Sequence, residues 1–278
     1  AKNDGKIIKN YELIFENEDR NDINNVNAAF EKLKKQGVTA IIGAASSSAT
    51  LALSDLANES RITLLSPASS SPEINEGPGN YVYRNYPSDT LQAQQLSNVI
   101  FQKCRAQKVL MVRARNAFSE GITFDLLRFG RQNSTQIPGE VVKFDSDPDK
   151  VDFPAVVDRI VEINPQAVFL AAYNPSLIPL IREIRSREDL ADLYIFTCSA
   201  FLSDEAVKVL GQETVEGVMF TDYHWDPNEN KPEVQEFSKK FQRDYHAVPT
   251  LYAATGYDAM WILVHAMEGI NHTIADEV

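Results

Sequence analysis

The chain has 278 residues, enough to bury a core and within the range where one domain commonly divides into two. Its net charge of −12, from 39 acidic and 27 basic residues, disfavours nucleic acid and anionic membranes as partners, because attraction to phosphate needs clusters of Lys and Arg. No run approaches the roughly 18 apolar residues of a membrane helix, so we expect no membrane span in this chain, and its polar start does not resemble an export signal.

Helix-period and strand-like segments alternate along the first 65 residues, which is the pattern of a parallel α/β sheet. Asp22 can cap a helix whose apolar residues recur at offsets 0, 3, 4 and 7, and Gly37 ends it. The apolar strand at 38–42 should be buried on both faces. The elements expected here are strands at 11–16, 38–42 and 62–65 and helices from 22 to 36 and from Ser47 or Ser48 to about 58.

The same alternation continues from residue 81 to residue 221, and two helices follow it. Residues 224–232 are polar and bounded by prolines, so they are interpreted as a connection between two lobes. The expected strands are 81–83, 109–112, 140–144, 167–172, 193–197 and 215–221, and the expected helices are 88–104, 119–132, 153–161, 177–184, a short one to about 210, 232–245 and 250–268.

The motifs of the commoner enzyme classes are missing from the sequence. It contains no phosphate-binding P-loop, no dinucleotide fingerprint and no nucleophile elbow, and none of its four histidines has metal-site spacing. Cys104 and Cys198 lie 94 residues apart and are expected to be free buried thiols, with a disulfide as the alternative. We therefore expect no enzyme, no cofactor and no metal.

Two serine-rich loops follow neighbouring predicted strands. Residues 43–50 read Gly-Ala-Ala-Ser-Ser-Ser-Ala-Thr, and residues 64–73 read Leu-Leu-Ser-Pro-Ala-Ser-Ser-Ser-Pro-Glu. The carboxyl ends of parallel strands are where open α/β sheets bind ligands, and the first loop also opens a helix, whose free N–H groups suit a carboxylate. The alternative is that these serines only cap helices and form turns.

These loops, taken in order with later segments, resemble the type I periplasmic binding proteins, and most closely the branch that serves branched-chain amino acid ABC transporters. The further segments that carry the resemblance are Tyr-Arg-Asn-Tyr-Pro-Ser-Asp at 83–89, Asn-Ala-Phe-Ser-Glu-Gly at 116–121, Ala-Ala-Tyr-Asn-Pro at 171–175 and Tyr-Ala-Ala-Thr-Gly-Tyr-Asp-Ala at 252–259. The matches are loose one by one but span essentially the whole chain.

The resemblance implies two doubly wound parallel-sheet lobes joined by hinge strands. Lobe one would be residues 1–85 plus 223–278, and lobe two residues 86–222. It also implies a periplasmic or extracellular receptor that closes on a small polar ligand, such as a carboxylate, an amide or an amino acid. The receptor would deliver its ligand to the membrane subunits of an ABC transporter.

The family's binding residues map onto lobe one and lobe two separately. In lobe one, Ser47 and Ser70 would bind the ligand carboxylate through their hydroxyls, with the backbone around Ser69 assisting. In lobe two, Phe118 would pack on the ligand where the family usually has Tyr, and Tyr173 or Asn174 would contribute.

The sequence departs from the family at the residue that binds a ligand ammonium. Amino-acid binders generally place an acid in the loop after the strand ending near Phe196, but here that loop reads Thr-Cys-Ser-Ala-Phe at 197–201, with Ser199 central. A buried ammonium with no carboxylate costs several kcal/mol. Either Asp222 or another acid replaces it, or the ligand has no ammonium, and the second alternative is favoured. Tyr223 and Trp225 could line an aromatic wall or pack in the hinge.

A second departure concerns the ends of the chain: the family's first strand and helix, and its final strands, have no counterpart here. Two other functions stay open. The chain could be a sensory ectodomain of the same fold that reports to a signalling receptor or kinase, or an enzyme on a doubly wound fold, although no catalytic cluster is visible.

Overall fold

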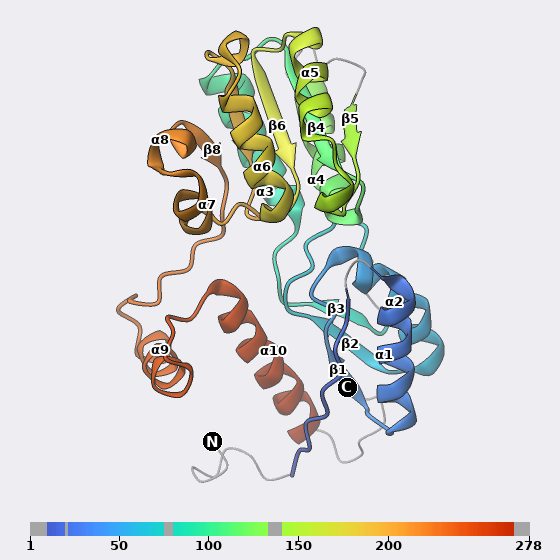
Figure 1. The fold of residues 1–278 in the computed structure, drawn as a ribbon. Helices are drawn as coiled ribbons and strands as arrows, with labels where there is room; N and C mark the ends of the chain where they lie inside the picture. The colour runs from blue at the N-terminus through green and yellow to red at the C-terminus, as the bar shows by residue number, and fades with distance from the viewer. Residues whose placement is uncertain (1–9, 20–21, 75–79, 133–140, 270–278) are drawn as a thin grey trace. The chain divides into compact units, whose positions relative to one another are not determined.

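The computed structural model describes residues 10–19, 22–74, 80–132 and 141–269, and it divides into two compact units (Figure 1). Unit 1 comprises Ala1–Pro87 and Tyr223–Val278, and unit 2 is Ser88–Asp222. Each contains a parallel sheet with helices on both faces, which confirms the predicted fold class. Neither segment that connects the units, around 87–88 and 222–223, is a strand, so the expected hinge strands are irregular chain.

Unit 1 contains a three-stranded parallel sheet in the order β1-β2-β3. Successive side chains of a strand point to opposite faces, and β2 shows this alternation. Leu64 packs in the cluster that contains Phe30 of α1 and Leu53 of α2, whereas its neighbour Leu65 packs against Leu263 of α10. The elements of this unit are α1 (Ile23–Lys35), β1 (Ala40–Ile42), α2 (Ser47–Ser60), β2 (Thr63–Ser66), β3 (Val82–Arg84), α9 (Pro232–Tyr245) and α10 (Leu251–Glu268).

Unit 2 contains a five-stranded parallel sheet in the order β5-β4-β6-β7-β8. In β4, Leu110 and Val112 face the cluster built with α5 and α6, while Val109 and Met111 face the cluster built with α3 and α4. The elements are α3 (Asp89–Ser97), the π-helix η2 (Asn98–Lys103), β4 (Val109–Ala114), α4 (Ala117–Gln132), β5 (Val141–Phe144), η3 (Pro148–Lys150), α5 (Phe153–Ile163), β6 (Ala167–Ala171), α6 (Asn174–Arg185), η4 (Glu188–Leu190), β7 (Tyr194–Thr197), α7 (Ser203–Leu210), α8 (Gln212–Val215) and β8 (Val218–Phe220).

The local signals in the sequence identified most of these elements. Asp22 caps α1 by accepting a hydrogen bond from the Asn24 N–H, and Gly37 follows the helix with φ +75°, as predicted. The expected helix from 88 to 104 is present, but its second half, Asn98–Lys103, is a π-helix. The expected strand at 215–221 is shorter, because Gln212–Val215 forms α8.

Three local expectations are wrong. Residues 11–16 form no strand, because a strand needs a hydrogen-bonded neighbour and this segment pairs with none in the described sheet. β1 is not buried on both faces: in the sheet formed by the described residues it pairs only with β2, and Ile42 is 37% exposed. The cap of α2 is Ser46, whose hydroxyl accepts from the Ala49 N–H, while Ser47 begins the helix.

Three findings bear on the classes of function that remain open. Within the described residues, no helix combines the length and apolar character needed to cross a bilayer. No group of three or more His, Cys, Asp and Glu side chains in those same residues could hold a metal ion. Both cysteines are free thiols, as expected, but only Cys198 is buried as predicted, whereas Cys104 is half-buried.

The stability of unit 2 should depend on the apolar layer between its sheet and α3 and α4. Phe196 of β7 is fully buried there, so Phe196→Ala should lower the free energy of unfolding by about 3–5 kcal/mol. Phe124 of α4 is 65% exposed, and Phe124→Ala should change it by less than about 0.5 kcal/mol. Urea unfolding followed by circular dichroism measures both, and equal losses would contradict this description of the core.

Candidate functional site

The first serine loop and the second are joined at the carboxyl edge of the unit 1 sheet. The Ala44 carbonyl accepts a hydrogen bond from the Ser66 hydroxyl (2.6 Å) and lies within hydrogen-bond distance of the hydroxyls of Thr50 (3.3 Å) and Ser69 (3.4 Å). The Thr50 and Ser69 hydroxyls share a hydrogen bond of 2.8 Å, so one of them donates to the other and only the remaining one donates to Ala44. Side-chain hydroxyls thus satisfy a buried carbonyl where the chain leaves the strand, which fixes both loops.

Ser47 and Ser70, two of the predicted ligand residues, are brought together by direct hydrogen bonds. The Ser47 Oγ accepts from the N–H groups of Ser70 (3.2 Å) and Ser71 (3.1 Å), and all three residues are buried. A serine hydroxyl that accepts two hydrogen bonds still has its own hydrogen to donate. The geometry is therefore compatible with the predicted role of Ser47 as a donor to a ligand carboxylate.

The start of α2 already binds a carboxylate of the chain itself. The N–H of Ala45, one residue before the cap Ser46, donates to Oε1 of Glu18 at 2.9 Å. This N–H precedes the helix, so the contact shows that the loop binds a carboxylate of the chain and leaves the predicted use of the helix N–H groups a prediction.

Aromatic side chains pack around the connecting segments in unit 1. Tyr86 stacks on Tyr252 of α10, with ring centroids 5.8 Å apart, and meets the edge of Tyr223 at 5.2 Å. Trp225 donates through Nε1 to the carbonyl of Pro249 at 2.9 Å. Tyr223 and Trp225 were expected either to line an aromatic wall or to pack in the hinge. Their described contacts are packing contacts beside the segments that connect the two units.

In unit 2, the predicted aromatic residues lie against each other. Phe118, in the first turn of α4, stacks on Tyr173 at the start of α6, with centroids 5.1 Å apart and an angle of 21° between the rings. Phe118 is only 4% exposed, and Tyr173 is half-buried. Tyr173 is therefore the more exposed side chain of the pair and the more accessible one for a ligand.

Asn174 has a structural role. Its Nδ2 donates to the Leu202 carbonyl (3.1 Å) and to Glu205 Oε2 (2.8 Å), and its Oδ1 accepts from the Leu202 N–H (3.0 Å). Both amide hydrogens are thus used to fix the loop before α7 onto α6. A contact from Asn174 to a ligand would have to use its carbonyl oxygen or replace one of these bonds.

Sequence reasoning missed Gln92, whose buried amide connects three segments of unit 2. Its Nε2 donates to Asp89 Oδ1 (2.9 Å) and to Ser199 Oγ (2.9 Å). Its Oε1 accepts from the Ser199 N–H (2.9 Å) and from Thr221 Oγ1 (3.1 Å). The start of α3, the loop after β7 and the end of β8 are therefore held by one side chain. Ser199, another predicted ligand residue, is bound to protein partners through its N–H and hydroxyl.

The end of β7 lies in a negative electrostatic environment. Burial raises the pKa of the Cys198 thiol to about 12, and the negative charges of Asp89 and Asp222 contribute to the same shift. Asp222, predicted as a ligand residue, is exposed, whereas Asp89 is fully buried.

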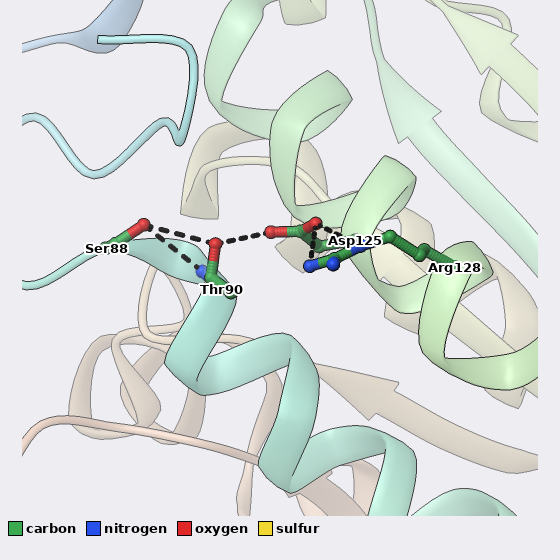
Figure 2. A network of polar contacts seen from close by, with 4 residues as sticks. All are labelled: Ser88, Thr90, Asp125 and Arg128. Atoms are coloured by element: carbon green, nitrogen blue, oxygen red, sulfur yellow. Dashed lines mark hydrogen bonds and ion pairs between the residues drawn. The ribbon is translucent and has the colours of Figure 1, made fainter. Parts of the chain in front are cut away.

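A second polar network fastens the start of α3 to α4 (Figure 2). Thr90 Oγ1 donates to Asp125 Oδ2 at 2.5 Å, and Arg128 donates to Asp125 Oδ1 through Nε (3.0 Å) and an Nη nitrogen (2.7 Å). The Ser88 hydroxyl caps the helix beside Thr90. The first residues of unit 2 are thus held on the helix that carries Phe118.

Comparisons with known proteins agree with the resemblance seen in the sequence. A family model described as periplasmic binding protein matches residues 2–278. The Leu/Ile/Val-binding protein of Citrobacter freundii is 26% identical, with 82% of this chain and 61% of the relative covered. The Leu/Ile/Val/Thr-binding protein of Salmonella typhimurium is also 26% identical, with 88% of this chain and 64% of the relative covered. The chain thus spans under two thirds of the length of these curated relatives.

Solved structures show the same fold. The leucine-binding protein LivK from Thermotoga maritima gives a TM-score of 0.78 at 25% identity, covering 92% of this chain and 71% of that one. The substrate-binding protein LivJ from Streptococcus pneumoniae gives 0.75 at 20% identity, covering 92% and 72%. These proteins are named as binding proteins, which agrees with the prediction that the chain is not an enzyme.

The network of Figure 2 should contribute measurably to stability. Thr90→Val keeps the shape of the side chain but leaves the buried Asp125 oxygen without its hydroxyl donor, so the free energy of unfolding should fall by about 1–3 kcal/mol. Thr90→Ser keeps the hydroxyl and should lie closer to the wild type. Chemical denaturation measures both, and a Thr90→Val variant as stable as Thr90→Ser would show that the hydrogen bond contributes nothing.

Proposed function

The chain belongs to the periplasmic binding protein family, and we propose that it is a solute-binding receptor for a small molecule that carries a carboxylate. The observation that carries this proposal is the paired serine loop of unit 1. There, buried hydroxyl and N–H groups of Ser47, Ser69 and Ser70 gather at the carboxyl edge of a parallel sheet.

The ligand class is supported by the Ser47 hydroxyl, which accepts two hydrogen bonds and still has its hydrogen to donate, whereas the N–H groups of Ser69 and Ser70 already donate to Ser66 and Ser47. Hydroxyl and N–H groups donate hydrogen bonds to a carboxylate without needing an opposite charge, and such charge-assisted bonds are stronger than neutral ones. The chemistry is also supported by the curated relatives, which are named for binding branched-chain amino acids and threonine, all of them carboxylates. A small amide that accepts hydrogen bonds is the neutral alternative.

The proposed mechanism is closure of the two units on the ligand. Unit 1 would bind the carboxylate, and unit 2 would then add contacts from Tyr173, Phe118 and the loop that carries Ser199. Asn174 and Asp222 stay candidates for this second set, although Asn174 already binds Leu202 and Glu205. A ligand shifts the equilibrium towards the closed form only if it binds that form more tightly than the open form. The shift equals the free energy of the extra contacts that it makes after closure.

The proposed context is transport. A receptor of this kind would act in the periplasm or outside the cell and deliver its solute to the membrane subunits of an ABC transporter. A sensory ectodomain that passes closure to a receptor or kinase is the second candidate. An ATPase assay with purified transporter subunits distinguishes the two functions. A transport receptor should stimulate ATP hydrolysis by these subunits, whereas a sensory ectodomain should not.

The serine loop generates a direct test. A thermal-shift screen of the twenty amino acids, small aliphatic and aromatic carboxylates and the matching amides should identify at least one ligand. Ser47→Ala and Ser70→Ala should then each weaken its binding by about 10- to 100-fold, the equivalent of one lost hydrogen bond to a charged group. Isothermal titration calorimetry measures the change.

Ser54→Ala is the matched control, since the Ser54 hydroxyl donates to the Thr50 carbonyl within α2 and should leave affinity unchanged. Normal binding by both loop variants would disprove this site. A screen in which no compound shifts the melting temperature would count against solute binding itself.

A further inference from the structure

We infer that Glu18 is a specificity-determining residue of the paired serine loop of unit 1. It fixes the loop through one peptide group, and its negative charge weakens the preference of the loop for a carboxylate over a neutral amide. This inference rests on the proposed function and deepens it, because it concerns the charge of the solute at the same site. Glu18 belongs to neither serine-rich loop and stands 27 positions before Ala45, the residue that it binds.

A single peptide group connects Glu18 to the hydroxyls of the loop. The N–H of Ala45 donates to Glu18 Oε1 at 2.9 Å. The carbonyl of the same trans peptide is that of Ala44, which accepts from the Ser66 hydroxyl at 2.6 Å and lies 3.4 Å from the Ser69 hydroxyl. A trans peptide is planar and directs its N–H and its carbonyl to opposite sides. Glu18 therefore holds one end of the group whose other end orients the buried hydroxyls.

Glu18 is held in place by the segment that carries it, residues 10–19. At the start of this segment, the Tyr11 hydroxyl donates to Oε1 of Glu268 at the end of α10, at 2.9 Å. In its middle, Glu16 forms an ion pair of 3.2 Å with Lys32 of α1. The segment is thus fastened to two helices of unit 1, and Glu18 cannot move away from the loop without straining these contacts. A charge fixed beforehand keeps its effect when a ligand enters.

The charge of Glu18 is not neutralised by a cation among the residues that the structure describes. In that part of the chain its only polar contact is the hydrogen bond from the uncharged Ala45 N–H, whereas Glu16 faces the ammonium group of Lys32. An adjacent opposite charge cancels most of the potential of an acid at a distance, and a neutral donor does not. The loop therefore experiences the negative charge of Glu18 more strongly than that of Glu16.

The distance between this charge and the proposed carboxylate donor is short. Ser47 stands two positions after Ala45, so their Cα atoms are at most about 7 Å apart. A carboxylate bound by Ser47 would thus lie on the order of 10 Å from Glu18, comparable with the 8–10 Å over which salt screens exposed charges. Glu18 is half-buried, which weakens the screening further. The repulsion acts on a carboxylate and not on a neutral amide.

The experiment compares each carboxylate with the amide of the same carbon skeleton. The pairs are 4-methylpentanoate and 4-methylpentanamide, benzoate and benzamide, and L-leucine and L-leucinamide. An amide keeps an oxygen that accepts hydrogen bonds and lacks the negative charge. Direct or competition calorimetry gives Kd for both members of each pair, and the readout is the ratio of the amide Kd to the carboxylate Kd.

Glu18→Gln keeps an oxygen that can accept from the Ala45 N–H and removes only the charge. For at least one pair, this variant should bind the carboxylate at least threefold more tightly than the wild type does, and the amide within twofold of the wild type. Glu16→Gln is the matched control, because it removes the same charge from the same segment at the residue that pairs with Lys32. Its ratio should stay within twofold of the wild-type ratio.

Glu18→Ala tests the hold on the loop, because it removes the hydrogen bond to the Ala45 N–H together with the charge. It should weaken binding of the amide at least threefold, since the Ala44–Ala45 peptide loses one of its partners. Its ratio should rise as that of Glu18→Gln does, which keeps the test decisive if Glu18→Gln does not fold. Circular dichroism verifies the fold of each variant.

The outcomes separate this inference from the proposed function. An unchanged ratio in the Glu18 variants, or an equal rise in Glu16→Gln, overturns the effect of the Glu18 charge while solute binding stands. Wild-type affinity of Glu18→Ala for the amide overturns the hold on the loop. If the wild-type protein binds no member of any pair, the proposed function fails and the inference fails with it.

Discussion

Both units have to meet the same constraint, which is that a parallel sheet leaves main-chain groups without partners where its strands end. At the carboxyl edge the chain turns into a loop, and a buried N–H or C=O left there without a hydrogen bond costs about 1–3 kcal/mol. Unit 1 satisfies these groups with hydroxyls, and those of Ser66, Thr50 and Ser69 surround the Ala44 carbonyl. Unit 2 satisfies them with an amide, that of Gln92, which serves the Ser199 N–H.

These solutions decide what each edge can bind. Short hydroxyl side chains hold the loops of unit 1 close together, and the Ser47 hydroxyl keeps a hydrogen that the proposed carboxylate would accept. The amide of unit 2 holds the start of α3 and the loop after β7 together, because it donates to both Asp89 and Ser199.

The sequence predicted the parts of this account that depend on local pattern. Apolar side chains at offsets 0, 3, 4, 7 and 8 identified α5, and the serine loops could be placed at the sheet edge because each follows a strand. The pairing of residues 11–16 could not be judged in this way, because alternation shows a capacity for pairing and not the presence of a neighbour.

The contacts of Gln92 could not be predicted from the sequence for a related reason. Gln92 and Ser199 are 107 residues apart, and only the fold brings them together. One signal was available: Asp89 and Gln92 stand three residues apart in the first turn of a helix, and both turn out to be buried, which is unusual for their types.

The crystal structure of the protein with its tightest-binding solute would test the central claim most directly. The account predicts density for one small molecule whose carboxylate lies within hydrogen-bond distance of Ser47 and Ser70. A solute bound away from the serine loop, or one whose carboxylate is held by other residues, would contradict it.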